Sequence, residues 1–233
     1  YQVKDKAKLE RLMKEYGVDT QIALAEAVMA EFGKQEGPLQ FTRRAPAKRV
    51  EIWKKFDIYP RGIDREIVEI MHRTHIGVDQ DYENLVSQST RAAIGDGWGG
   101  SMIATDLQDV LFGCPYPVKS SANLGVLKED HVNLIIHGHE PLLSEMIVTA
   151  AELPEMVEYA RQKGANGIQL SGICCTANEI LMRHGIPIAG NFLQQELAIV
   201  TGAVEAMVVD VQCIMENVAN VAACFHTKII TTN

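Results

Sequence analysis

The feature that most constrains the fold of this chain is a change of pattern near residue 130. Beyond it, short apolar runs recur, and a helical pattern separates each run from the next. We expect strands at 132–136, 167–171, 187–189, 206–210 and 227–231. We expect helices at about 142–151, 154–163, 177–184, 193–202 and 214–223. This alternation, with continuous apolar strands, predicts a Rossmann-like, doubly wound parallel sheet covered by helices on both faces.

Helix-boundary residues in this half agree with that prediction. Pro141 and Pro154 lie near the first turns of two expected helices, where proline is favoured. Thr176 and Glu179 have the T-x-x-E spacing of a capping box. Glycines follow three of the expected helices, at positions 164, 185 and 202, where a left-handed residue often ends a helix.

The chain before residue 130 has a different character. Apolar residues at three- and four-residue spacing predict helices over 5–16 and 20–32, and two further helices are expected over 63–75 and 79–94. A glycine-rich segment, residues 95–101, is expected to break the helical pattern. We therefore predict an α/β chain with a mainly helical region, residues 1–125, followed by a Rossmann-like domain, residues 126–233.

Composition excludes several classes of function. The 233 residues include 22 Lys+Arg and 30 Asp+Glu, a net charge of -8, which predicts no binding to nucleic acid or to an anionic membrane. No apolar run approaches the roughly 18 residues of a membrane-spanning helix. Five cysteines, an odd number that includes adjacent ones, do not fit a secreted disulfide framework. We predict a cytoplasmic protein and, because the chain begins at Tyr1 without a methionine and stops in a strand, a piece of a longer one.

Candidate metal ligands follow three of the expected strands. His137 and His139 come after the first strand, Cys174 and Cys175 after the second, and Cys213 after the fourth. Ligands of open parallel sheets bind outside the carboxyl ends of the strands. We therefore expect the imidazole of His139 and the thiols of Cys175 and Cys213 to lie at one edge of the sheet. Soft ligands that are distant in sequence and adjacent in the fold predict a metal site. Cys175 also begins a helix, whose dipole favours the thiolate.

Other interpretations of these residues remain open from the residues alone. A cysteine in an apolar α/β core is often a small buried side chain, and we expect Cys224 to lie in the core. Cys175 and His139 could instead form a nucleophile pair, which leaves Cys213 without a role. A closed zinc site or an iron–sulfur cluster usually needs four protein ligands, so the predicted site is incomplete in this chain.

The motifs around these residues resemble the nickel–iron–sulfur carbon monoxide dehydrogenases of anaerobes. The similarity covers most of the chain from about residue 50. Its most specific parts are the H-G-H-E-P motif, the Cys-Cys turn and V-D-V-Q-C, found within VNLIIHGHEPLLSEMIV (132–148), GICCTANEILMRHGIP (172–187) and AIVTGAVEAMVVDVQCIM (198–215). Further matching stretches are HRTHIGVDQDYENL (72–85), DGWGGSMIATDLQDVLFG (96–113) and FHTKIITT (225–232).

The resemblance implies that this chain is part of the catalytic subunit of an oxidoreductase. That enzyme reversibly oxidises CO with water to CO2, two protons and two electrons. The family does this at a nickel–iron–sulfur cluster, the C-cluster. By motif, His139 and Cys175 resemble ligands of its unique iron, and Cys213 resembles a ligand of the remaining iron–sulfur part. His139 suits the family motif better than His137. Asp96 is expected to be an acid close to the cluster, with a catalytic role beside His139.

The resemblance also implies what lies outside this chain. The cysteines for the [4Fe–4S] clusters and for nickel are expected beyond its ends, so the isolated chain is predicted to be inactive. Expected partners are an electron acceptor such as a ferredoxin, a second copy in a homodimer, and in some members an acetyl-CoA synthase subunit. Two other classes stay open: a metal-free α/β scaffold domain, and a hybrid-cluster relative that reduces small nitrogen species.

Overall fold

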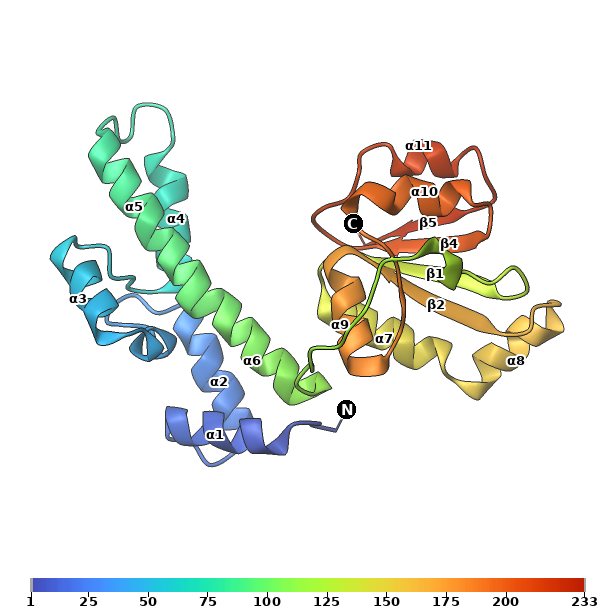
Figure 1. Cartoon of the computed structure of the whole chain (residues 1–233). Helices are drawn as coiled ribbons and strands as arrows, with labels where there is room; N and C mark the ends of the chain where they lie inside the picture. The colour runs from blue at the N-terminus through green and yellow to red at the C-terminus, as the bar shows by residue number, and fades with distance from the viewer. Residues whose placement is uncertain (1, 233) are drawn as a thin grey trace. The chain divides into compact units, whose positions relative to one another are not determined.

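The computed structural model describes residues 2–232, which form two compact units (Figure 1). One unit ends at Gly113 and the other begins at Cys114. Tyr1 and Asn233, the outer residues of the predicted ranges, lie outside the described residues. The segment before the sheet contains the short 3-10 turn η3 (Leu124–Val126), and the neighbouring Asn123 N–H donates to the Ile188 carbonyl at 3.0 Å. These residues therefore pack with the sheet, and the domain boundary at residue 125 stays a prediction.

The first unit is built from helices around one apolar core. They are α1 (Lys6–Tyr16), α2 (Gln21–Phe32), α3 (Ala47–Lys55), α4 (Ile63–Arg73), α5 (Tyr82–Gly95) and α6 (Ser101–Phe112), with the 3-10 turn η1 (Gln40–Arg44) after α2. The core combines Leu12 of α1, Val28 of α2, Phe41 of η1 and Ile103 of α6. The sequence pattern identified α1, α2, α4 and α5 but missed α3 and α6.

The glycine-rich segment does not break the helix, so that prediction is wrong. Asp96–Gly100 form the π-helical turn η2, which joins α5 to α6, and Figure 1 shows the two helices continuing in line. A Cβ atom on Gly99 would come within 2.8 Å of Leu39 Cδ1. A larger residue at position 99 would therefore require the buried Leu39 side chain to shift, so the close packing of this turn favours glycine despite its low helix propensity.

The second unit is a parallel sheet, as predicted. Within the described residues its five strands have the order β3-β2-β1-β4-β5, and every neighbouring pair is parallel. The strands are β1 (Val132–His137), β2 (Ile168–Ile173), β3 (Ile188–Gly190), β4 (Val204–Val209) and β5 (Lys228–Thr231). The helices are α7 (Pro141–Ala151), α8 (Pro154–Gln162), α9 (Cys174–His184), α10 (Gln195–Val200) and α11 (Val218–Ala222), with the 3-10 turn η4 (Phe192–Gln194) before α10.

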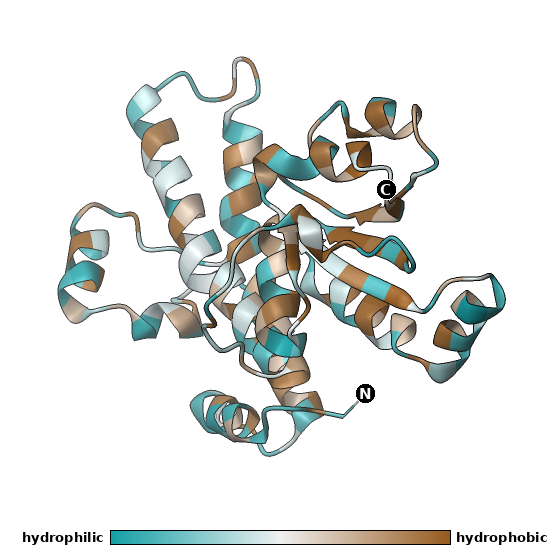
Figure 2. Cartoon of the chain, turned by 45° about the vertical axis from the view of Figure 1, so that its right-hand side comes forward, coloured by the Kyte–Doolittle hydropathy of each residue, from teal (hydrophilic) through white to brown (hydrophobic). Residues whose placement is uncertain are grey.

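Apolar side chains cover both faces of this sheet. On one face, Ile135 and Met207 pack with Ile199 of α10 and Val218 of α11. On the other face, a second cluster joins strand residues to α7 and α9; it comprises Ile136, Val148, Ala151, Leu170, Ile180 and Ile186. Figure 2 shows hydrophobic residues concentrated along the strands. The structure therefore confirms the doubly wound α/β fold.

The predicted helix boundaries are confirmed in part. Pro141 and Pro154 are the first residues of α7 and α8. The glycines at 164, 185 and 202 all have positive φ angles just after helices. The predicted capping box is wrong, because α9 begins at Cys174 and the Thr176 hydroxyl inside its first turn has no hydrogen-bond partner. Among residues 2–232, no helix is long and apolar enough to cross a membrane.

Candidate metal centre

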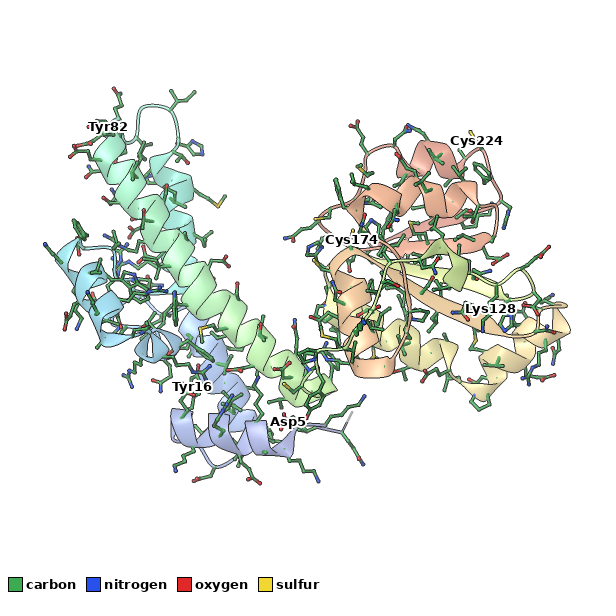
Figure 3. The ribbon with its side chains drawn as sticks, viewed as in Figure 1. Asp5, Tyr16, Tyr82, Lys128, Cys174 and Cys224 are labelled. Carbon is green, nitrogen blue, oxygen red and sulfur yellow. The ribbon has the colours of Figure 1, made fainter. Side chains whose placement is uncertain are left out.

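The three predicted ligands follow neighbouring strands of the sheet. His139 lies just beyond β1, Cys175 just beyond β2 and Cys213 beyond β4, and these strands are adjacent in the order β2-β1-β4. From β1 the chain builds β2 and β3 on one side of β1, and then β4 and β5 on its other side. The strand order therefore reverses between β1 and β4, which is where ligands bind in such sheets. Figure 3 shows Cys174 at this carboxyl edge, whereas Lys128, which precedes β1, lies toward the opposite edge.

Two of these side chains are in direct proximity. The Nε2 atom of His139 lies 3.9 Å from the Sγ atom of Cys213. The Cys175 and Cys213 side chains are exposed and Cys174 is partly buried, and all three are free thiols. In the part of the chain that the structure describes, no three His, Cys, Asp or Glu side chains converge around one point as ligands of a single metal ion would.

Two thiols at this edge, Cys174 and Cys175, have a raised pKa. Burial raises the pKa of Cys174 to about 11, and the charges of Cys213 and Cys175 contribute. Burial, Cys213 and Glu179 likewise raise the pKa of Cys175. The expectation that the start of α9 would favour the Cys175 thiolate is therefore wrong, because desolvation and neighbouring negative charge dominate. A bound cation would compensate these charges, since metals bind the deprotonated thiol.

The backbone at this edge adopts unusual conformations. Of the non-glycine residues described, four have positive φ angles, and three of them are Cys174 (64°), Gln212 (63°) and Cys213 (52°). Such conformations cost on the order of 1–3 kcal/mol each and concentrate at functional sites. The tertiary structure therefore holds both cysteine-bearing loops in shapes that the isolated segments would avoid.

Several buried polar atoms at this edge have no hydrogen-bond partner. His137 is fully buried, and within the described residues no partner meets its ring nitrogens at full hydrogen-bond geometry. Burial lowers the pKa of His137 and so favours the neutral ring, although the Gln195 side chain and the Ile173 backbone lie close enough to oppose this shift. The Nδ1 atom of His139 and the hydroxyls of Ser171 and Thr176 are also unpartnered. Buried polar groups are normally paired, so this cluster indicates a site completed by another group.

Two residues that the sequence analysis missed connect the ligand-bearing loops. Asp210 directly follows β4, and its carboxylate accepts the backbone N–H groups of His139 at 2.6 Å and Glu140 at 2.7 Å. Gln195, the first residue of α10, donates to the Cys213 carbonyl at 2.6 Å and accepts the Met215 N–H at 2.9 Å. A polar residue at the end of an apolar strand was the available signal for Asp210. Gln195 carried none.

Two further candidates lie on other segments of the chain. Asp96 is exposed on the π-helical turn of the helical unit. Cys224 is exposed beside α11, where its Sγ atom contacts the Asn220 carbonyl oxygen at 3.7 Å, so the expectation that it lies in the core is wrong. Figure 3 shows Cys224 well away from Cys174 within the sheet unit.

Comparison of the whole chain with known proteins identifies its family. A model of the Prismane/CO dehydrogenase family matches residues 1–233. The chain belongs to this family. A Methanosarcina mazei protein named carbon monoxide dehydrogenase 1 is 63% identical over all of this chain, which covers 38% of that protein. The carbon monoxide dehydrogenase/acetyl-CoA synthase subunit beta of Moorella thermoacetica is 46% identical over all of this chain, which covers 36% of it.

The solved structures agree in fold. A nickel-free carbon monoxide dehydrogenase from Thermococcus sp. AM4 superposes with a TM-score of 0.91 and is 51% identical over the whole of this chain, which covers 38% of that structure. The resemblance noted in the sequence is therefore confirmed at the level of the family. The chain spans less than two-fifths of the length of these relatives.

Proposed function

We propose that this chain is part of the catalytic subunit of a nickel–iron–sulfur carbon monoxide dehydrogenase. The whole protein would interconvert CO and water with CO2, two protons and two electrons. The observation that carries the proposal is the arrangement of His139, Cys175 and Cys213 after three adjacent parallel strands in a chain of this family. The high identity to relatives named carbon monoxide dehydrogenases supports this activity over hybrid-cluster chemistry.

The donor atoms present suit one side of an iron–sulfur cluster. Thiolates and imidazole are the ligand types that such clusters use. A cluster spreads its ligands over several metal ions, which agrees with side chains that do not converge on one point. The unpartnered polar atoms and left-handed loops at this edge support the same assignment. When bound, the cluster would accept the two electrons and polarise water near neutral pH.

His139 is a better candidate ligand than His137. Its Nε2 atom lies 3.9 Å from the Cys213 thiol, so the two groups can serve neighbouring metal ions. The His137 ring is fully buried, with no exposed area from which to approach a cluster. We propose that His139 and Cys175 bind the unique iron and that Cys213 binds the remaining iron–sulfur part. The proposed catalytic roles of His139 and of Asp96 as an acid near the cluster rest on the resemblance of their motifs.

The proposal extends to the parts of the protein beyond this chain. The remaining cluster cysteines and the [4Fe–4S] clusters for electron transfer would lie there, so the 233-residue chain alone should not oxidise CO. We propose a cytoplasmic homodimer that passes electrons to an acceptor such as a ferredoxin. Because a Moorella thermoacetica relative is named as a subunit of carbon monoxide dehydrogenase/acetyl-CoA synthase, an acetyl-CoA synthase subunit is a partner to test by copurification.

The decisive experiment replaces single cysteines in the full-length protein produced without oxygen. Cys175→Ala and Cys213→Ala should lose nickel and cluster iron and abolish CO-dependent reduction of a viologen dye. Cys224→Ala is the matched control, because its thiol is also exposed but lies away from the proposed site. Full metal content and activity in both site variants would contradict the proposal and favour a domain whose cysteines do not bind metal.

A further inference from the structure

We propose that Asp210 is a positioning residue that sets the spacing of His139 and Cys213. This inference rests on the proposed function, in which both side chains bind the cluster. Asp210 is 8% exposed and lies between β4 and the Cys213 loop. It therefore belongs to one ligand-bearing segment while its carboxylate binds the other.

The hydrogen bonds of Asp210 define this role. Oδ1 accepts the His139 N–H at 2.6 Å, and Oδ2 accepts the Glu140 N–H at 2.7 Å. Oδ1 also accepts the N–H of Val211, within its own loop. The backbone N–H of Asp210 donates to the His137 carbonyl at 3.1 Å. With both oxygens accepting backbone N–H groups, the carboxylate acts as a bridge between the loops.

The loop after β1 is shaped around this carboxylate. Gly138 has a φ angle of 135°, and a Cβ atom at this position would collide with the Asp210 side chain. The Gly138 carbonyl accepts the Thr176 N–H at 2.8 Å, which connects the same loop to the first turn of α9. The segments that carry His139, Cys175 and Cys213 are therefore joined through residues 138–140, and Asp210 supplies the connection on the β4 side.

A carboxylate is required because only donors face it. Asparagine has nearly the same shape, but its NH2 group replaces one of the two carboxylate oxygens. At that position the side chain would present N–H donors to a backbone N–H group that needs an acceptor. In Asp210→Asn, the amide would face either the His139 or the Glu140 N–H with no acceptor. The loop would shift away from Cys213, while the apolar contacts of β1 and β4 would remain.

The chain offers a matched control at the opposite edge of the same strands. Glu205 of β4 accepts the N–H of Asn133 of β1 at 2.5 Å. Glu205→Gln thus perturbs a carboxylate-to-backbone bridge between the same two strands, but at their amino ends. A purely structural role for Asp210 predicts similar behaviour of the two variants.

The test measures nickel release in the full-length protein under anaerobic conditions. Asp210→Asn should lose nickel to a chelator about 10–100-fold faster than the wild-type protein, the usual effect of removing a group that orients a ligand. Its cluster should also show an altered electron paramagnetic resonance spectrum, whereas Glu205→Gln should match the wild type in both. Wild-type nickel retention and spectrum in Asp210→Asn would overturn the inference. Wild-type nickel retention in Cys213→Ala would overturn the proposed function instead.

A second measurement needs no variant and applies if Asp210→Asn does not fold. In metal-free full-length protein, hydrogen exchange resolved to single amides should show the His139 and Glu140 N–H groups protected, because Asp210 binds them without the cluster. Exchange as fast as that of open loop amides would overturn the inference.

Discussion

The two units of this chain differ in where their unpartnered buried polar groups lie and in how their buried carboxylates are paired. In the helical unit, buried carboxylates are paired with cations and amides from other segments. At the carboxyl edge of the sheet, buried imidazole and hydroxyl groups are left without partners. The helical unit therefore pairs its buried carboxylates internally, although the Tyr16 hydroxyl and the Arg91 Nε atom have no partner there among the described residues. At the sheet edge the unpartnered atoms gather beside the predicted ligands, which indicates an edge arranged for a group that this chain does not supply.

The helical unit contains two ion-pair networks. Glu66 is fully buried and binds Arg61 at 2.8 Å and Gln88 at 2.8 Å. Asp106 of α6 binds Lys8 of α1 at 2.8 Å and Arg44 of η1 at 2.6 Å. Arg61 lies just before α4, but the contact of Gln88 and both contacts of Asp106 connect segments that are distant in sequence, so these contacts fix how the helices pack.

The largest expected effect comes from breaking one of these networks. Glu66→Ala in the full-length protein should lower the local free energy of opening of α4 by about 3–5 kcal/mol, because Arg61 would lose its buried partner. Peptide-resolved hydrogen exchange measures this quantity. Glu10→Ala, at an exposed position of α1, should change it by less than about 0.5 kcal/mol. Equal effects of the two variants would remove the contrast between the units.

A glycine substitution tests the sheet edge. Gly138→Ala should add about 1–3 kcal/mol of overpacking against Asp210 to about 1–3 kcal/mol of backbone strain. Gly164 also has a positive φ angle, but the space around it is open. Gly164→Ala should therefore add backbone strain without overpacking. Hydrogen exchange of the two loops and nickel content should separate the variants. Normal nickel content in Gly138→Ala would show that the His139 loop tolerates displacement, which would contradict the prediction.

Apolar substitutions should have different consequences in the two units. Gln88→Leu should cost about 1–3 kcal/mol, because Glu66 loses a buried donor. In the metal-free protein, His137→Leu should change stability by less than about 1 kcal/mol, because the ring nitrogens that it removes make no hydrogen bond of full geometry within the described residues. Local hydrogen exchange of α5 and β1 checks both. A large loss of stability in His137→Leu would mean that its ring has a partner in the whole protein.

The smallest expected effect is a pH dependence of the helical unit. Burial alone would raise the pKa of Glu66, but hydrogen bonds from Arg61 and Gln88 lower it overall below its ordinary value near 4.5. The stabilisation from the charged carboxylate is therefore complete above pH 4.5 and is lost as the pH falls through the folded-state pKa. The difference in α4 stability between the wild type and Glu66→Gln should shrink below pH 4.5. A constant difference would contradict this linkage.

Local patterns predicted the elements well and the glycine-rich turn poorly. The strands follow from continuous apolar runs, and α7 and α8 begin at prolines as expected. Residues 96–100 stay helical because Gly99 packs against Leu39 and Ile63, contacts that no local pattern contains. The helix α9 begins before Thr176, because it follows the buried strand β2 directly: β2 ends at Ile173 and α9 starts at Cys174.

The sequence by itself determined the strands, most of the helices and which ligand types follow the strands, because periodicity is a local property; it missed α3 and α6. Only the tertiary structure decided that β1 pairs with β4 and that His139 and Cys213 come within 3.9 Å. It also decided that Asp210 binds the N–H of His139, a residue 71 positions away. Such contacts depend on how packed strands and helices bring distant segments together, and that packing is a property of the whole fold.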